Sequence, residues 1–149
     1  NKKYKINKSV KKILKKEKNY ININNLKNFK KSIVNSKLKL LKILIEIKNK
    51  NKKIYGISAP SRASTLINYV GIDENIIDCV LEIDGSKKIN KMIPGTKIPI
   101  LNEKILYKDK PDFVIIFSWH IFNEIKTNLR KKGYRGKFIV PLPTPKIIN

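Results

Sequence analysis

The stretch Ile54-Tyr-Gly-Ile-Ser-Ala-Pro-Ser-Arg-Ala-Ser-Thr-Leu-Ile-Asn-Tyr-Val-Gly71 decides the fold of this chain. It begins as a short apolar strand, passes through a turn of small residues and continues into a helical pattern that ends at Gly71, a typical C-terminal cap. A strand, a turn and a helix in this order leave backbone N–H groups and a helix N-terminus above the end of the strand, where an anion is favoured. The stretch therefore predicts a phosphate- or nucleotide-binding turn in an α/β protein.

Short apolar runs alternate with helical patterns along the rest of the chain, which is typical of parallel βαβ units. The expected strands are residues 54–57, 76–83, 97–101, 113–117 and 137–142, and the expected helical segments are 63–69, 103–107 and 121–132. We predict an α/β fold with a Rossmann-like, open sheet of about five mostly parallel strands and flanking helices. Three prolines, Pro141, Pro143 and Pro145, are expected to end the last strand.

An amphipathic helix is predicted to precede the sheet. Residues 1–22 form a lysine- and asparagine-rich lead-in that we expect to be weakly helical or disordered. From Leu26 to Lys48, apolar residues spaced three and four apart predict a helix of about six turns. Its apolar stripe must pack against the sheet or against a domain that this chain lacks. We therefore divide the chain into residues 1–48, the lead-in and helix, and residues 49–149, the Rossmann-like domain.

The charge of the chain is concentrated in its first third. The net charge is +23 over 149 residues, and residues 1–53 hold nineteen lysines against Glu17 and Glu46. Arginine is scarce, and proteins that read nucleic acids usually combine arginine and aromatic residues with lysine. We expect a solvated basic surface, and binding of nucleic acid remains the less favoured alternative.

Two further classes are disfavoured by composition. No run approaches the roughly 20 apolar residues of a membrane span, so we expect no membrane partner. Cys79 is the only cysteine, which excludes an internal disulfide and fits a cytoplasmic protein. We expect it to be a small buried residue of a strand, and we expect no metal site.

The turn after the first strand carries the strongest candidate binding residues. Small residues let a phosphate approach the backbone, the hydroxyl groups of Ser61, Ser64 and Thr65 offer donors, and Arg62 can hold a phosphate with two parallel hydrogen bonds. The alternative is an ordinary strand-to-helix turn with serine caps.

The ends of the later strands add polar residues at the same predicted edge. Glu82 is suited to accept a sugar hydroxyl, or alternatively to pair with neighbouring lysines. Trp119 is suited to stack on a base or sugar, although packing is favoured, and His120 is suited to move a proton or to cap the following helix. Glu124 follows His120 by one helical turn, so the two side chains can meet. No nucleophile with its base and no paired carboxylates are found, so we expect an incomplete catalytic apparatus.

Several collinear segments resemble one family. They are Tyr55 to Ile72, Ile93-Pro-Gly-Thr-Lys-Ile-Pro-Ile100, Pro111-Asp-Phe-Val-Ile-Ile116, Ser118-Trp-His120, Asn123-Glu-Ile125 and Phe138-Ile-Val-Pro-Leu-Pro143. Together they resemble the C-terminal domain of bacterial S-adenosylmethionine-dependent sugar C-methyltransferases, enzymes that branch deoxysugars on nucleotide carriers. The resemblance covers about residues 30–148. It departs from the family pattern at Pro60–Ser64 and around Glu82–Asp84.

The resemblance implies a function as one part of a larger enzyme. In that family a zinc-binding domain and a central methyl-transfer domain precede the Rossmann-like domain, and the nucleotide-sugar lies between the last two. It implies a dTDP-type nucleotide-sugar and the central domain as partners, S-adenosylmethionine bound by the full-length enzyme rather than by this chain, and no turnover by this chain alone. Catalytic residues stay unknown, with His120 as the candidate. The residues expected on the substrate side are Ser58, Ser61, Arg62, Ser64, Thr65, Asn68, Glu82, Lys88, Lys91, Trp119 and His120.

Two other functions remain open. The domain is alternatively a non-catalytic interaction module of the same fold, in which the long helix docks a partner domain. Less favoured is a basic nucleic-acid-binding domain that uses the lysine-rich first third.

Overall fold

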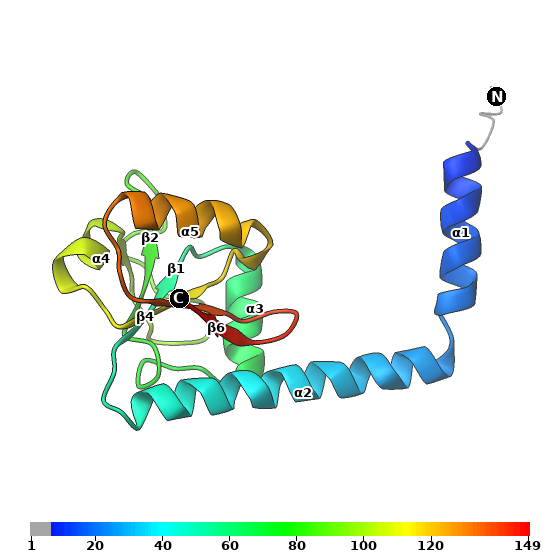
Figure 1. Cartoon of the computed structure of the whole chain (residues 1–149), viewed down its shortest axis with the longest axis horizontal. Coiled ribbons are helices and arrows are strands. Elements are labelled where there is room, and N and C mark those ends of the chain that lie inside the picture. The colour runs from blue at the N-terminus through cyan, green and yellow to red at the C-terminus, as the bar shows by residue number, and fades with distance from the viewer. Residues whose placement is uncertain (1–6) are drawn as a thin grey trace. The chain divides into compact units, whose positions relative to one another are not determined.

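Two helices form the first part of the chain in a computed structural model, which describes residues 7–149 (Figure 1). Helix α1 (Lys8–Tyr20) begins at Asn7, whose side chain accepts a hydrogen bond from the Ser9 N–H at 3.2 Å. Helix α2 (Ile23–Lys48) follows Asn22, whose Oδ1 accepts from the Asn25 N–H at 2.9 Å. Residues 8–20 of the lead-in are thus helical, and residues 1–6 of it lie outside the described residues. The Asn22 cap starts the long helix three residues before Leu26. The chain forms two compact units, residues 1–35 and residues 36–149, and the division between them falls inside α2.

A six-stranded sheet forms the centre of residues 36–149. Its strands are β1 (Ile54–Ile57), β2 (Cys79–Glu82), β3 (Ile100–Asn102), β4 (Phe113–Ile116), β5 (Lys137–Val140) and β6 (Lys146–Ile148). The spatial order is β3-β2-β1-β4-β5-β6; the first five strands are parallel, and β6 pairs antiparallel with β5. This order confirms the predicted Rossmann-like, mostly parallel sheet.

The helices lie on both faces of the sheet. They are α3 (Ser61–Val70), α4 (Lys104–Asp109), the short 3-10 helix η1 (Trp119–Ile121) and α5 (Phe122–Lys131). The C-terminal half of α2 and helix α3 pack on one face, while α4 and α5 pack on the other. Successive strand residues therefore face opposite cores: Ile115 joins the α2–α3 side and Val114 the α4–α5 side. A parallel sheet covered on both faces explains why its strands appear in the sequence as continuous apolar runs.

The bounds of four strands, β2, β3, β4 and β5, differ from the sequence-based expectation, and one strand was missed. Strand β2 is shorter because the N–H groups of Ile76 and Ile77 both bond the Asp73 carbonyl in a turn. Strand β3 begins later than residue 97 because the chain first folds back, with the Ile93 N–H bonding the Ile98 carbonyl at 2.9 Å. The prolines end β5 as expected, but the chain then reverses into β6, which was not predicted.

The amino edge of the sheet contains an ion pair whose contribution to the free energy of unfolding is expected to depend on pH. The Asp112 carboxylate lies 2.9 Å from the Lys52 ammonium and accepts from the Lys53 N–H at 3.3 Å. The hydrogen bond from Lys52 is the main cause that holds the pKa of Asp112 below its ordinary value. A carboxyl with a lowered pKa stabilises the folded state above its ordinary pKa, and this contribution is lost as pH falls through the folded-state pKa.

We therefore expect Asp112→Asn to lower the free energy of unfolding at pH 7 by less than about 1 kcal/mol, because the pair is partly exposed and screened. The difference from the wild type should shrink as pH falls below about 4. Urea unfolding at a series of pH values measures it. A difference that is the same at pH 7 and at pH 2.5 would show that the ion pair is not its cause.

Candidate functional site

The loops that follow β1, β2 and β4 meet at the carboxyl edge of the sheet. Strands β1 and β4 are neighbours, but the chain leaves β1 into α3 on one face and leaves β4 towards α5 on the other. Such a reversal of winding direction opens a crevice at the carboxyl ends of the two strands, where doubly wound proteins bind their ligands. The polar residues predicted at the strand ends are brought to this crevice.

Two serine hydroxyls join the ends of β1 and β4. The Oγ atoms of Ser58 and Ser118 lie 2.6 Å apart, and Ser118 is buried. Ser58 has a left-handed backbone with φ 61°, and its N–H bonds the Leu81 carbonyl at 2.8 Å. The sequence placed Ser118 at a strand end, but only the adjacency of β1 and β4 shows that it contacts Ser58.

A buried carboxylate fixes the turn after β1. Glu82 Oε1 accepts from the Ala59 N–H at 2.7 Å and lies 3.5 Å from Lys88 Nζ, which donates to the Ala59 carbonyl at 2.8 Å. The N–H and the carbonyl of Ala59 are thus bound by one acidic side chain from the end of β2 and one basic side chain from the segment between β2 and β3. Of the two interpretations of Glu82, the structure shows the pairing with a lysine, and one carboxylate oxygen is engaged within the protein. We refer to Ala59, Glu82 and Lys88 as the Ala59 clamp.

The N-terminus of α3 carries no side-chain cap. Its N-cap residue is Pro60, whose side chain has no group that can form a capping hydrogen bond. The Ser64 hydroxyl does not cap the helix either, because it donates to the Ser61 carbonyl at 2.9 Å. The alternative of a turn with serine caps is therefore not what the structure shows. An uncapped helix start has free N–H groups with a partial positive charge and favours an anion.

Arg62 links this helix start to the loop after β4. Its guanidinium nitrogen lies 3.3 Å from His120 Nδ1, and its Cζ lies 5.7 Å from the centre of the Trp119 ring. Trp119 is half-buried and packs against the α2–α3 core, as the packing interpretation predicted, while its ring also supports Arg62. His120 and Arg62 are exposed. His120 belongs to η1 and does not cap α5, whose N-cap is Ile121.

The remaining predicted residues occupy different settings. Asn68 Nδ2 donates to the carbonyls of Ser64 at 2.7 Å and Pro94 at 2.9 Å, so it ties α3 to the turn at Gly95. Ser61, Thr65 and Lys91 are exposed. Within residues 7–149, the side chains of Thr65 and Lys91 make no hydrogen bond to the residues of this crevice, and His120 makes no ion pair with Glu124.

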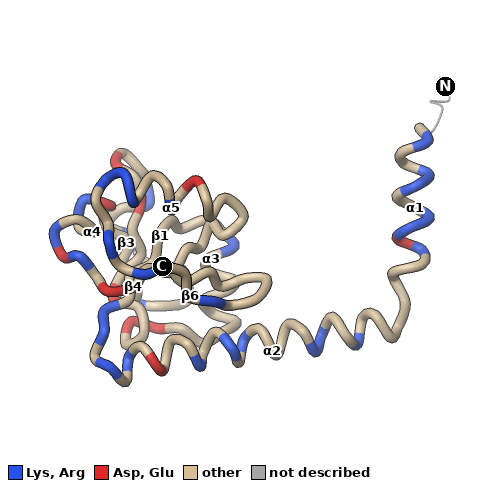
Figure 2. The backbone as a smooth tube through the Cα atoms, in the orientation of Figure 1, with Lys and Arg blue, Asp and Glu red and all other residues tan. Residues whose placement is uncertain are grey.

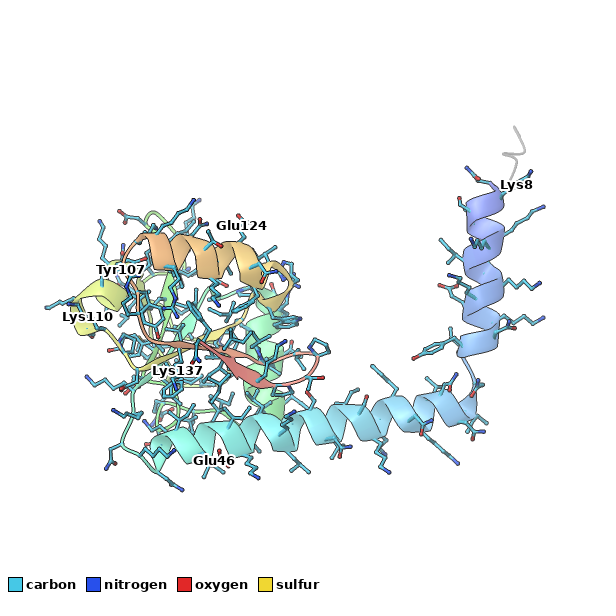
Figure 3. The ribbon with its side chains drawn as sticks, viewed as in Figure 1. Lys8, Glu46, Tyr107, Lys110, Glu124 and Lys137 are labelled. Carbon is cyan, nitrogen blue, oxygen red and sulfur yellow. The ribbon has the colours of Figure 1, made fainter. Side chains whose placement is uncertain are left out.

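A cavity of about 620 Å³ lies beside His120. It is lined by residues 119–124 of the β4–α5 segment and by Val140, Leu142, Pro143, Thr144 and Lys146 of the β5–β6 connection. Glu124 of α5 borders it (Figure 3). The sequence did not indicate that the β5–β6 connection lines this cavity, because strand β6 and the reversal of the chain before it were not predicted.

A second cavity, of about 730 Å³, lies at the opposite, amino edge. Tyr107, Lys110 and Lys137 line it (Figure 3), and the Tyr107 hydroxyl is buried without a hydrogen-bond partner among the described residues. Burial raises the pKa of Tyr107. Helices α4 and α5 both end at this edge, and helix C-termini disfavour anions. The carboxyl edge is therefore the better candidate for a phosphate-bearing ligand.

Residues 7–149 contain neither a candidate metal site nor a candidate membrane-spanning helix. No group of three or more His, Cys, Asp and Glu side chains in that range is arranged to hold a metal ion. No helix in the same range has both the length and the apolar character needed to cross a membrane.

Comparison with known proteins identifies the family of this chain. Residues 1–143 match the family model described as the C-methyltransferase C-terminal domain. The C-methyltransferase NovU of Streptomyces niveus is 29% identical over 99 residues, which cover 66% of this chain and 23% of that protein. The chain thus spans about a quarter of the length of this curated relative. Since the family model covers nearly the whole chain, the protein belongs to the C-methyltransferase C-terminal domain family.

Proposed function

We propose that this domain binds the diphosphate and sugar of a dTDP-type nucleotide-sugar and presents the sugar to the methyl-transfer centre of an S-adenosylmethionine-dependent C-methyltransferase. The observation that carries the proposal is the position of Arg62. It lies in the first turn of α3, whose N-terminus has no side-chain cap, at the carboxyl edge of β1. A guanidinium beside free helix N–H groups is a suitable receptor for a diphosphate.

The surrounding contacts orient Arg62. The Trp119 ring lies below the guanidinium and His120 lies beside it, so two sides of Arg62 are defined by the β4–α5 segment. Lys88 adds a second cation, since its ammonium is half-exposed while it bonds the Ala59 carbonyl. A diphosphate with two or more negative charges is complementary to this pair of cations.

The cavity beside His120 provides room for the sugar. It adjoins the Arg62–His120 contact, and its lining combines apolar residues such as Leu142 with polar ones such as Thr144. A hydroxyl-rich ring attached to a diphosphate at Arg62 would reach this cavity. His120, which borders the cavity, is then placed to bind a sugar hydroxyl or to hold a proton near it.

The crevice is not suited to the methyl donor. The sulfonium of S-adenosylmethionine is cationic, and the exposed Arg62 and Lys88 at the turn after β1 are cations that would repel it. The Glu82 carboxylate beside Lys88 is buried and accepts from the Ala59 N–H. We therefore assign donor binding and the methyl transfer itself to the part of the enzyme that this chain does not match.

Calorimetric titration tests the proposal. Thymidine diphosphate and a dTDP-deoxysugar should bind the chain saturably, with dissociation constants between micromolar and millimolar, whereas S-adenosylmethionine should give no heat. Arg62→Ala should weaken nucleotide binding by about 10- to 100-fold, because a charge-assisted hydrogen bond contributes roughly 1.5–3 kcal/mol.

Arg135→Ala is the matched control. Arg135 is another exposed arginine, but it lines the amino-edge cavity, so its removal should leave nucleotide affinity unchanged. Equal affinity of Arg62→Ala and the wild type would contradict the proposed site. No nucleotide binding by the wild type would contradict the proposal itself and favour a purely structural module.

A further inference from the structure

Residues 8–35 carry an apolar face that nothing covers within the described part of this unit. In α1, Val10, Ile13 and Leu14 lie on one side of the helix and are 44%, 56% and 54% exposed. Helix α1 buries none of its residues. Isolated helices of this length are marginal in water, and contiguous exposed apolar surface usually marks an interaction site.

Helix α2 also carries an apolar stripe, and the C-terminal half of this stripe is packed in the protein core. Leu26, Ile33, Leu40 and Ile47 are seven residues apart, so they lie on one side of the helix. Leu40 and Ile47 are 1% and 4% exposed in the α2–α3 core. Leu26 and Ile33 are 56% and 37% exposed. The C-terminal half of the stripe is thus packed within residues 36–149, whereas within residues 8–35 nothing packs on its N-terminal half.

The charge of this segment limits the choice of partner. Residues 8–35 contain nine lysines and one acidic residue, Glu17, which gives a net charge of +8 (Figure 2). A second copy of the chain would bring two such segments together, and their repulsion opposes a symmetric dimer through this face. An apolar groove with carboxylates at its rim is complementary to both features.

Family membership indicates where such a groove belongs. The family model is a C-terminal domain, and the match to the Streptomyces niveus relative takes up 23% of that protein. A C-methyltransferase therefore has a large portion outside this domain, and that portion must contact it for the sugar to reach the methyl donor.

We propose that the apolar face of residues 8–35 docks the methyltransferase portion of the enzyme in an apolar groove rimmed by acidic residues. Val10, Ile13, Leu14, Leu26, Phe29 and Ile33 form the buried centre of this contact, and the lysines around them contact the acidic rim. The inference rests on the proposed function in placing the sugar on this chain and methyl transfer outside it. Nucleotide binding by the isolated chain is measured separately, so the two can fail independently.

Cysteine labelling tests the docking surface. Cys79 is buried, and burial raises the pKa of its thiol to about 12, so it does not compete with an introduced exposed cysteine. Leu26→Cys reports on the apolar face, and Asn28→Cys, two residues on and on the other side of α2, is its matched control. The probe is the methyltransferase portion that completes this chain to an enzyme, joined to it or added as a separate protein.

In the 149-residue chain alone, both cysteines should react with iodoacetamide at similar rates. With the methyltransferase portion present, alkylation of Leu26→Cys should slow by about tenfold or more, as expected if the site is open about one-tenth of the time or less. The rate at Asn28→Cys should not change.

Three results would overturn the docking proposal. The first is equal reactivity of Leu26→Cys with and without the methyltransferase portion. The second is protection of Leu26→Cys in the chain alone together with a doubled mass in sedimentation, which would show a second copy as the occupant. The third is protection by phosphatidylserine-containing vesicles and not by the methyltransferase portion, which would show a membrane surface.

Discussion

Replacement of Gly56 by valine is expected to unfold residues 36–149 under conditions in which the wild type is folded. Gly56 is a central residue of β1, and a Cβ at this position would lie 2.7 Å from Phe117 Cε2 and 2.8 Å from Val80 Cγ2. Both neighbours are fully buried, so neither can move into solvent. Overpacking typically costs about 1–3 kcal/mol and occasionally more, and two contacts below 3.0 Å from the Cβ alone place the branched valine at or above the upper end of this range, a large fraction of the stability of a small domain.

Urea unfolding followed by circular dichroism measures the effect. Gly56→Ala keeps the experiment informative if the valine variant does not fold, because the smaller side chain should give a smaller loss of the same sign. Gly71→Ala is the control: Gly71 has φ 85° with open space around it, so alanine there costs only the backbone strain, about 1 kcal/mol. If Gly56→Ala and Gly56→Val were no more damaging than Gly71→Ala, the close contact with Phe117 would be wrong.

Removal of the acid of the Ala59 clamp is expected to reduce both stability and nucleotide binding. In Glu82→Ala the buried N–H of Ala59 loses its acceptor, and Lys88 loses its anionic neighbour. An unsatisfied buried donor costs about 1–3 kcal/mol. The loosened turn leads directly into Arg62, so affinity for thymidine diphosphate should fall by about tenfold.

Glu82→Gln separates the hydrogen bond from the charge. Its side-chain carbonyl can still accept from the Ala59 N–H, so stability and affinity should stay close to those of the wild type. Asp84→Ala is the positional control, because that carboxylate lies two residues on, is exposed and pairs with Lys104 away from the turn. We expect it to leave the unfolding midpoint and the affinity unchanged. Glutamine and alanine variants of Glu82 that are equally impaired would show that the hydrogen bond to Ala59 does not hold the turn.

We propose different roles for residues 36–149 and for residues 8–35. In the proposed enzyme, the Ala59 clamp would hold the turn after β1, Arg62 and Lys88 would provide the positive charge for a diphosphate, and the cavity beside His120 would receive the sugar. The helices of residues 8–35 have a different proposed role, which is to dock the methyl-transfer portion. The two roles are carried by different residues, and the variants above test them separately.

The sequence alone determined the local elements and the family. Strands such as Phe113–Ile116 were predictable because a strand buried on both faces must be apolar at every position. The helix ending at Gly71 was predictable because a left-handed cap strongly favours glycine, and its φ of 85° agrees. The candidate residues of the turn after β1 were also named from the sequence, since local chain order places them at the start of a helix.

Only the tertiary structure decided which of these residues contact one another. Ser58 meets Ser118, and Arg62 meets His120, because β1 and β4 are neighbours in the sheet although about sixty residues separate them in the chain. Strand β6 was missed because three residues are too few to give a clear pattern and because it is an edge strand that pairs only with β5. The sequence also left the role of Glu82 undecided. A carboxylate at a strand end binds the protein itself only where a backbone N–H lies within hydrogen-bond distance. Long-range packing brings the Ala59 N–H to Glu82, and the sequence does not show this contact.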